Sequence, residues 1–182
     1  MNFIPETPKG LNQSVPFYED ATRTDGWQGQ ATEKSVKTLQ AEIIQAIGRL
    51  GGLVTGFQRG GFQGEGGQRE GFRIHYVIEA ADGKQMPGRI DIAALPVKDD
   101  YSLRRTVDKR KEAALKMALY MLREALDGTW FLQQLSPGYS ALVPFMIGPG
   151  AKTISELWAE STMNNLLPPG EEEFIEGEIV NG

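Results

Sequence analysis

The chain of 182 residues contains no cysteine and only one histidine, His75. The absence of cysteine excludes disulfide bonds, thiolate metal sites and cysteine nucleophiles. A single histidine on the polar side of a strand is more often a surface residue than a catalytic base. No apolar stretch approaches the roughly 20 residues that cross a membrane, and the first residues resemble neither a signal nor a transit peptide. We therefore expect a soluble, cytoplasmic protein with no membrane contact, no metal, no cofactor and no enzymatic activity.

Positive charge is concentrated in one short stretch. The chain has 24 acidic residues against 19 lysines and arginines, a net charge of −5. Five of the acids lie between Glu171 and Glu178, so the rest of the chain is close to neutral. Between Arg104 and Lys116 there are six cationic side chains and only two acidic ones. Such a field attracts polyanions, because lysine and arginine displace the counterions condensed on phosphates. The six cations are Arg104, Arg105, Lys109, Arg110, Lys111 and Lys116.

Turn-forming residues and composition divide the chain into three parts. Residues 1–30 contain three prolines and several aromatic residues without a regular period. They predict an N-terminal arm that packs on its own domain or, as the less favoured alternative, on a partner chain. Residues 31–167 predict a single α+β domain. Residues 168–182 begin with Pro-Pro-Gly and predict an acidic tail, which would recruit a protein partner or compete with nucleic acid for the basic stretch.

The domain begins with a helix and a short strand. Apolar residues at three- and four-residue spacing predict the helix from Thr32 to Leu50, and a strand follows at 53–57. Six of the thirteen residues at 59–71 are glycine. We expect a loop there that is mobile unless it is bound, because glycine has high chain entropy and buries nothing.

A β-hairpin comes next. Residues 72–79 alternate between apolar and polar side chains, and Asp82-Gly83 predicts a turn into a return strand at 84–95. A two-residue turn would place Ile90 on the polar face, so we predict a bulge at Pro87-Gly88 that restores it to the apolar face.

The second half is built around one long helix. It is predicted to start near Leu103 or Thr106 and to end near Leu126, and it is apolar nearly all round in its second half. Residues 141–147 predict either a short edge strand or an extended core segment, because Pro144 forbids a central strand. A capping box at 153–156 predicts a last helix. The expected fold is an antiparallel three-stranded sheet packed against two main helices, an α-β-β-β-α core with a C-terminal helix.

Three further cations and one aromatic residue extend the candidate site. In the Gly-rich segment, Arg59 and Arg69 would reach phosphates while Phe62 stacks on a base; a plain hairpin connection is the alternative. Arg73 would face phosphate from the polar face of the sheet, unless Asp91 pairs with it or with a neighbouring arginine. The basic stretch also has the alternative interpretation of a solvated helix face with local ion pairs.

The predicted order of elements resembles two families of nucleic-acid-binding proteins. KRKEAALKMALYML (109–122) is similar to the lysine-rich start of the second helix in the double-stranded RNA-binding domain. This resemblance implies that Lys109, Arg110 and Lys111 contact phosphates across a groove. The Gly-Pro-His loop of that family and its glycine-containing approach to the helix are missing.

The second resemblance is to phage and eukaryotic single-strand annealing proteins, which have a β-β-β-α core with a basic helix. RRTVDKRKEAALKMAL (104–119) is similar to that helix in character, and the resemblance covers about residues 32–127. The size, the neutral body and the acidic tail are similar to those of small phage recombination or single-strand-binding proteins. The resemblance implies single-stranded DNA as the ligand.

Together these patterns predict non-catalytic nucleic-acid binding, most of all of single-stranded DNA in phage or mobile-element recombination. A homo-oligomer would form through the N-terminal arm or through residues 129–147. The alternative is a protein-interaction or assembly component without a nucleic-acid ligand. A third class is a hydrolase or nuclease that uses Asp91, Asp99 or Asp100 with a divalent metal. The predicted contacts are Arg59, Phe62, Arg69, Arg73, Arg104, Arg105, Lys109, Arg110, Lys111 and Lys116.

Overall fold

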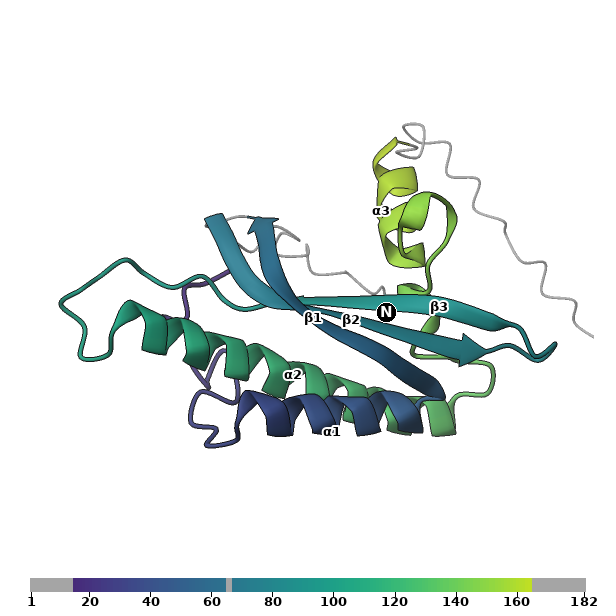
Figure 1. The fold of residues 1–182 in the computed structure, drawn as a ribbon, viewed down its shortest axis with the longest axis horizontal. Coiled ribbons are helices and arrows are strands. Elements are labelled where there is room, and N and C mark those ends of the chain that lie inside the picture. Colours follow the sequence, from purple (N-terminus) through teal and green to yellow (C-terminus); the bar gives the residue numbers. More distant parts are fainter. Residues whose placement is uncertain (1–14, 65–66, 165–182) are drawn as a thin grey trace, which may run out of the picture.

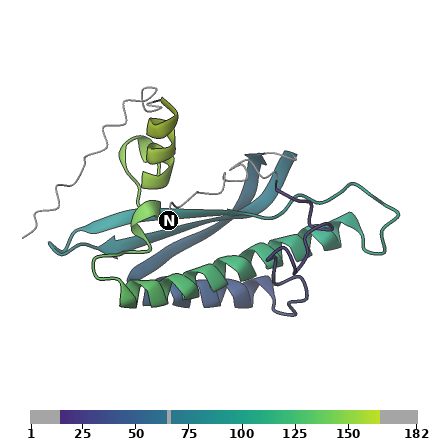
Figure 2. The same cartoon turned by 180° about the vertical axis from the view of Figure 1, so that it is seen from behind.

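The computed structural model describes residues 15–64 and 67–164, which form an antiparallel three-stranded sheet with helices on both faces (Figure 1). Two helices lie side by side along one face, and a third stands over the opposite face, as the view from behind also shows (Figure 2). This confirms the predicted α+β class and the order helix, three strands, helix. The elements are α1 (Val36–Arg49), β1 (Gly52–Gly64), β2 (Gly67–Glu79), β3 (Gln85–Ala93), α2 (Val107–Leu135), two short 3-10 turns (Val143–Phe145 and Pro149–Ala151) and α3 (Ile154–Asn164).

The core lies between the sheet and the pair of helices α1 and α2. Successive side chains of a strand point to opposite faces, and Ile74 and Tyr76 of β2 are fully buried on the helix side. They belong to one apolar cluster with Ile43 of α1 and Leu115 of α2. The predicted alternation of β2 therefore sets which face of the sheet the helices cover.

Capping residues fix where the two long helices begin. Ser35 precedes α1 and Thr106 precedes α2, and the side-chain oxygen of each accepts a hydrogen bond from a backbone N–H in the first turn. Helix α2 continues through Gly128 to Leu135, past the predicted end near Leu126. One glycine inside a helix costs only about 1 kcal/mol, and Trp130, just after it, packs against the core.

The Gly-rich segment is a β-hairpin and not the predicted loop. Strand β1 continues past residue 57 to Gly64, and β2 follows from Gly67. The two strands pair in an unbroken register from Gly56 onward. Backbone hydrogen bonds form the ladder, so glycine weakens a strand without preventing its pairing. β3 ends opposite Gly71, so the hairpin extends beyond the three-stranded sheet (Figure 1). We call this part, residues 59–64 and 67–70, the projecting hairpin.

The β2–β3 connection reaches the required register through a longer turn, and the predicted bulge at Pro87-Gly88 is wrong. Residues 81–83 form the turn, in which Gly83 has a φ of +79°. Glycine adopts this left-handed conformation without steric cost. The turn places Ile90 opposite Ile74 on the core face.

Gly88 has a packing role. A Cβ at this position would come within 2.2 Å of the Tyr76 ring, so only glycine allows the ring to lie there. Pro87 lies on β3, an edge strand, where a missing N–H is tolerated. The irregularity of the sheet is in β1, between Val54 and Gly56.

The segments at both ends of the core also pack on it. In residues 141–147 a 3-10 turn follows the fully buried Leu142, whose carbonyl accepts a 2.8 Å hydrogen bond from the Tyr76 hydroxyl. Burial raises the pKa of the Tyr76 phenol. In the described part of the N-terminal arm, the Tyr18 backbone N–H donates to Pro96 at 2.8 Å. The 153–156 capping box is present at the start of α3, as predicted.

Candidate nucleic-acid interface

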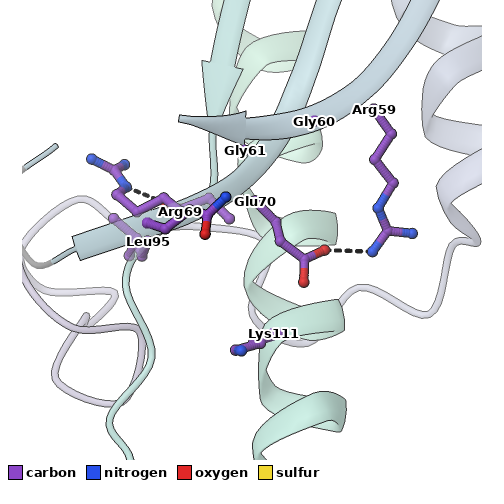
Figure 3. A pocket seen from close by; sticks show the side chains of 9 residues that line it. Arg59, Gly60, Gly61, Arg69, Glu70, Leu95 and Lys111 are labelled. Atoms are coloured by element: carbon purple, nitrogen blue, oxygen red, sulfur yellow. Dashed lines mark hydrogen bonds and ion pairs between the residues drawn. The ribbon is translucent and has the colours of Figure 1, made fainter. Parts of the chain in front are cut away.

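The projecting hairpin and the first turns of α2 enclose a shallow groove of about 350 Å³ (Figure 3). Arg59 and Arg69 of the hairpin line it together with Lys111 of α2, and the guanidinium of Arg69 points away from the other two side chains (Figure 3). Gly60 and Gly61 also line it, and a Cβ at Gly60 would meet no atom within 4 Å. The backbone is therefore open to a ligand at this position. We call this feature the hairpin groove.

The strand alternation explains why Arg59 faces α2. It pairs with Phe72, a core residue, and opposite residues of an antiparallel ladder share a face. Beyond the core that face is open, and 60% of the Arg59 side chain is exposed. Glu70 lies beside it at 2.5 Å and is 41% exposed. An ion pair this exposed contributes little to stability, so a phosphate can replace Glu70 as the partner of Arg59 at small cost.

Arg69 is held in place by backbone carbonyls. Its Nε donates to the oxygen of Ala94 at 2.6 Å and its Nη2 to the oxygen of Ala93 at 3.3 Å. Desolvation by burial lowers the pKa of Arg69, but a guanidinium keeps its charge in proteins. Neutral carbonyls orient this charge without cancelling it.

Arg110, for which the sequence analysis predicts a phosphate contact, is buried and does not line the hairpin groove. The residue is only 3% exposed. Its guanidinium pairs with the carboxylate of Glu19 in the arm. It also donates to the carbonyl oxygens of Lys98 at 2.8 Å, Asp100 at 2.6 Å and Arg105 at 3.1 Å. A phosphate cannot reach it without displacing these groups. We call this arrangement the Arg110 latch.

The other cations of the basic stretch divide around α2. Lys111 alone among the six lines the hairpin groove, while three others line a second depression of about 550 Å³ between α2 and residues 30–33. Of these, Lys116 also pairs with Glu112 at 3.3 Å. Arg104 is exposed just before the helix. The three residues of the second depression are Arg105, Lys109 and Lys116.

Arg73 lies on the opposite face of the sheet and is neutralised there. Its Nε and Nη2 each donate to an oxygen of Asp91 at 2.8 Å, and this hydrogen bonding raises the pKa of Arg73. Arg89 contacts the same Asp91 at 3.3 Å and Glu156 of α3 at 2.5 Å. The alternative in which Asp91 pairs with its neighbours is the one observed. We call these four residues the open-face cluster.

Phe62 does not line the hairpin groove. Its ring packs over Gly71, where an added Cβ would come within 2.7 Å of it. Phe62 lines a small depression of about 200 Å³ with Arg59 and Arg73. Arg59 therefore borders depressions on both sides of the hairpin edge, and Phe62 borders only one.

The sequence analysis missed Glu70, the acid inside the groove. Two-residue spacing from Phe72 places Glu70 on the core face of β2. Its proximity to Arg59 follows only from the hairpin register, which pairs Gly61 with Glu70. That register could not be derived while the segment was interpreted as a loop.

Membrane helices, metal clusters and relatives are the other features that could indicate a function. Within residues 15–64 and 67–164, no helix combines the length and the apolar character that a membrane crossing requires. In the same ranges, no three acidic or histidine side chains are grouped so that they could hold a metal ion. No protein-family model, curated protein or solved structure matches the chain.

Proposed function

We propose that this protein binds nucleic acid without catalysing a reaction, and that its ligand is single-stranded DNA in phage or mobile-element recombination. The hairpin groove carries the proposal. Arg59 and Arg69 line it together with Lys111, which belongs to a different element of the chain. Cations from separate elements that line one groove beside exposed backbone form a suitable site for phosphates.

The size of the groove favours a single strand. About 350 Å³ is near the lower limit of small-molecule sites and has room for part of one strand rather than for a double helix. Phe62 on the far side of the hairpin edge offers a ring for stacking, which is a contact that only unpaired bases can make. A strand that crosses the edge at Gly60 would meet both features.

The depression on the other side of α2 supports the same ligand. Arg105, Lys109 and Lys116 line it, and Arg104 is exposed nearby in the sequence. A flexible strand can follow cations around a helix start, whereas a rigid duplex cannot. Each phosphate contact on a single strand contributes about −0.7 to the slope of log affinity against log salt.

Fluorescence anisotropy with a labelled oligonucleotide tests the proposal. We expect salt-dependent binding, weaker for a duplex of equal length, and a loss of about tenfold or more for Arg59→Glu with Lys111→Glu. The matched control is Lys84→Glu with Lys152→Glu, which makes the same change in net charge outside the groove. Equal affinity of the two double variants would remove the groove from the proposal, and absence of binding by the unmodified protein would reject the function.

Assembly is the second candidate function, and one observation favours it. The end of α2 exposes three large apolar residues in the predicted oligomerisation segment 129–147: Phe131, Leu132 and Leu135, the last 82% exposed. Exposed apolar clusters of this kind mark contact surfaces. If copies associate here, Phe131→Asp with Leu135→Asp converts an oligomer to a monomer in sedimentation velocity. A monomeric unmodified protein that still binds DNA would contradict this candidate.

The acidic tail belongs to the same proposal. Residues 168–182 lie outside the described residues, and their role is to recruit a protein partner or to compete with DNA for the cations. Removal of the tail should then strengthen DNA binding at low salt and have less effect at high salt, because screening weakens the competition. Anisotropy at two salt concentrations measures the difference.

A further inference from the structure

The loop between β3 and α2 exposes an aromatic ring that no part of the proposed function uses. Tyr101 is 87% exposed, the highest value among the large apolar side chains of the described residues. The loop extends past the start of α2, at the end of the molecule that also carries the projecting hairpin (Figure 1). The loop that carries Tyr101 therefore lies at the same end of the molecule as the projecting hairpin.

The loop is fixed on both sides of this ring. The Arg110 guanidinium binds the carbonyl oxygens of Lys98 and Asp100 before Tyr101 and that of Arg105 after it. The Asp100 carboxylate accepts hydrogen bonds from the backbone N–H of Ser102 at 2.9 Å and from its hydroxyl at 2.6 Å. An ordered loop loses less conformational entropy when it binds a ligand. The structure thus holds the backbone and leaves the side chain in solvent.

The residues that follow Tyr101 provide charge for the same ligand. Arg104 and Arg105 are exposed, and in the described residues neither side chain is part of an ion pair. Sequence-tolerant binding of single strands combines stacking of bases on aromatic rings with cations that follow the phosphates. Tyr101 and these two arginines provide such a ring and such cations within five residues.

We infer that Tyr101 is a stacking platform for an unpaired base, with Arg104 and Arg105 on the adjacent phosphates. The inference rests on the proposed function and adds a second contact element to it. Bases inside a duplex are stacked on one another, so the ring contacts only unpaired bases. Phe62 and Tyr101 then provide two separate stacking sites on the same ligand.

Tyr101→Ala and Tyr101→Phe separate stacking from other roles. With oligothymidylate, we expect Tyr101→Ala to weaken binding by about fivefold to a hundredfold, the range that loss of one stacked base gives. Tyr101→Phe keeps the ring and should retain affinity. With an abasic oligomer of equal length, the unmodified protein and Tyr101→Ala should bind alike, and the salt slope should be the same for both. Tyr139→Ala, an exposed tyrosine after the end of α2, is the matched control.

The outcomes distinguish this inference from the proposed function. If the unmodified protein binds oligothymidylate and Tyr101→Ala binds it equally well, the stacking role is wrong and nucleic-acid binding stands. If Tyr101→Ala weakens binding to the abasic oligomer as much as to oligothymidylate, the ring does not read bases, and the inference also fails. If the unmodified protein binds neither, both are rejected. Thermal unfolding of the variants should match that of the unmodified protein, because the replaced ring is exposed.

Discussion

Two residues that are adjacent in the sequence, Arg110 and Lys111, lie in regions of opposite character. The Arg110 latch is buried, and its carboxylate partner, Glu19, is 14% exposed. The hairpin groove around Lys111 is open, and its acid, Glu70, is 41% exposed. Charge density along the sequence is the same at both positions. The difference shows that the depth at which a helix places each cation decides whether its charge is structural or available to a ligand.

The candidate binding residues depend on the Arg110 latch, whereas the latch does not depend on them. The latch holds the arm and the loop before α2 against the helix, and so it fixes the loop that carries Arg104 and Arg105. The groove residues Lys111 and Arg59 do not hold the latch in place, because their side chains are exposed. Changes in the latch should therefore affect both stability and binding, whereas changes in the groove should affect binding alone.

Replacement of Arg110 tests this asymmetry with the largest expected effect. Arg110→Met removes one partner of a buried ion pair, so Glu19 loses its guanidinium partner and three carbonyls lose the side chain that donates to them. We expect a loss of about 3–5 kcal/mol in the free energy of unfolding, measured by urea denaturation. The matched neighbour, Lys111→Met, should change it by no more than about 0.5 kcal/mol.

A second variant separates the loss of the partner from the loss of the packing. Arg110→Met with Glu19→Gln leaves no unpaired charge, so it should recover part of the stability. Equal stability of Arg110→Met and Lys111→Met would show that the latch does not hold the fold, and the comparison would lose its basis.

The sequence pattern predicts that Arg110 is buried, but not what it contacts. Ala114 and Met117 follow it at four and seven residues, and all three are buried on one stripe of α2. That spacing predicts burial of Arg110, whereas the density of charges in the same stretch favours exposure. The partner Glu19 is 91 residues away, and no local pattern indicates it. Helices and alternating strands could be predicted because their periods are local, whereas the latch depends on a long-range contact.

The projecting hairpin also depends on contacts that local composition does not predict. Glycine-rich composition at 59–71 predicts high chain entropy, but it does not indicate the ladder that pairs Gly60 with Gly71. The three cations of the groove were all named from the sequence. Their placement along one groove, and the separation of Lys109 from Lys111 around α2, depend on the register of the hairpin and on the rotation of the helix.

A charge-neutral change at Glu70 sharpens the comparison within the groove. Glu70→Gln removes the acid that competes with phosphate for Arg59, without a change in the shape of the groove. Because an exposed pair is worth about 0.2–1 kcal/mol, we expect tighter binding by up to about fivefold at low salt. Anisotropy titration measures this, and weaker binding would mean that Glu70 orients Arg59 for the ligand.

A third region provides a smaller contrast. Arg73 in the open-face cluster carries the same charge as Arg59, but Asp91 binds it through two hydrogen bonds. Arg73→Met should therefore change DNA affinity by less than about twofold, while the unfolding free energy falls by up to about 1 kcal/mol. A large loss of affinity with unchanged stability would place the cluster in the interface and remove the distinction between paired and available cations.

Glu156, one of the two acids of the open-face cluster, gives the smallest effect and a pH dependence. A hydrogen bond from the Thr153 backbone N–H, together with the nearby Arg89, lowers the pKa of Glu156 from its ordinary value. Its contribution to stability is therefore present above the ordinary pKa, and it is lost as the pH falls through the lowered one. Glu156→Gln keeps the side-chain oxygen of the capping box but not the charge. Because 45% of the side chain is exposed, we expect a loss below about 1 kcal/mol at pH 7. The difference from the unmodified protein should disappear in acid, and a difference that persists there in urea denaturation would assign the effect to packing and not to charge.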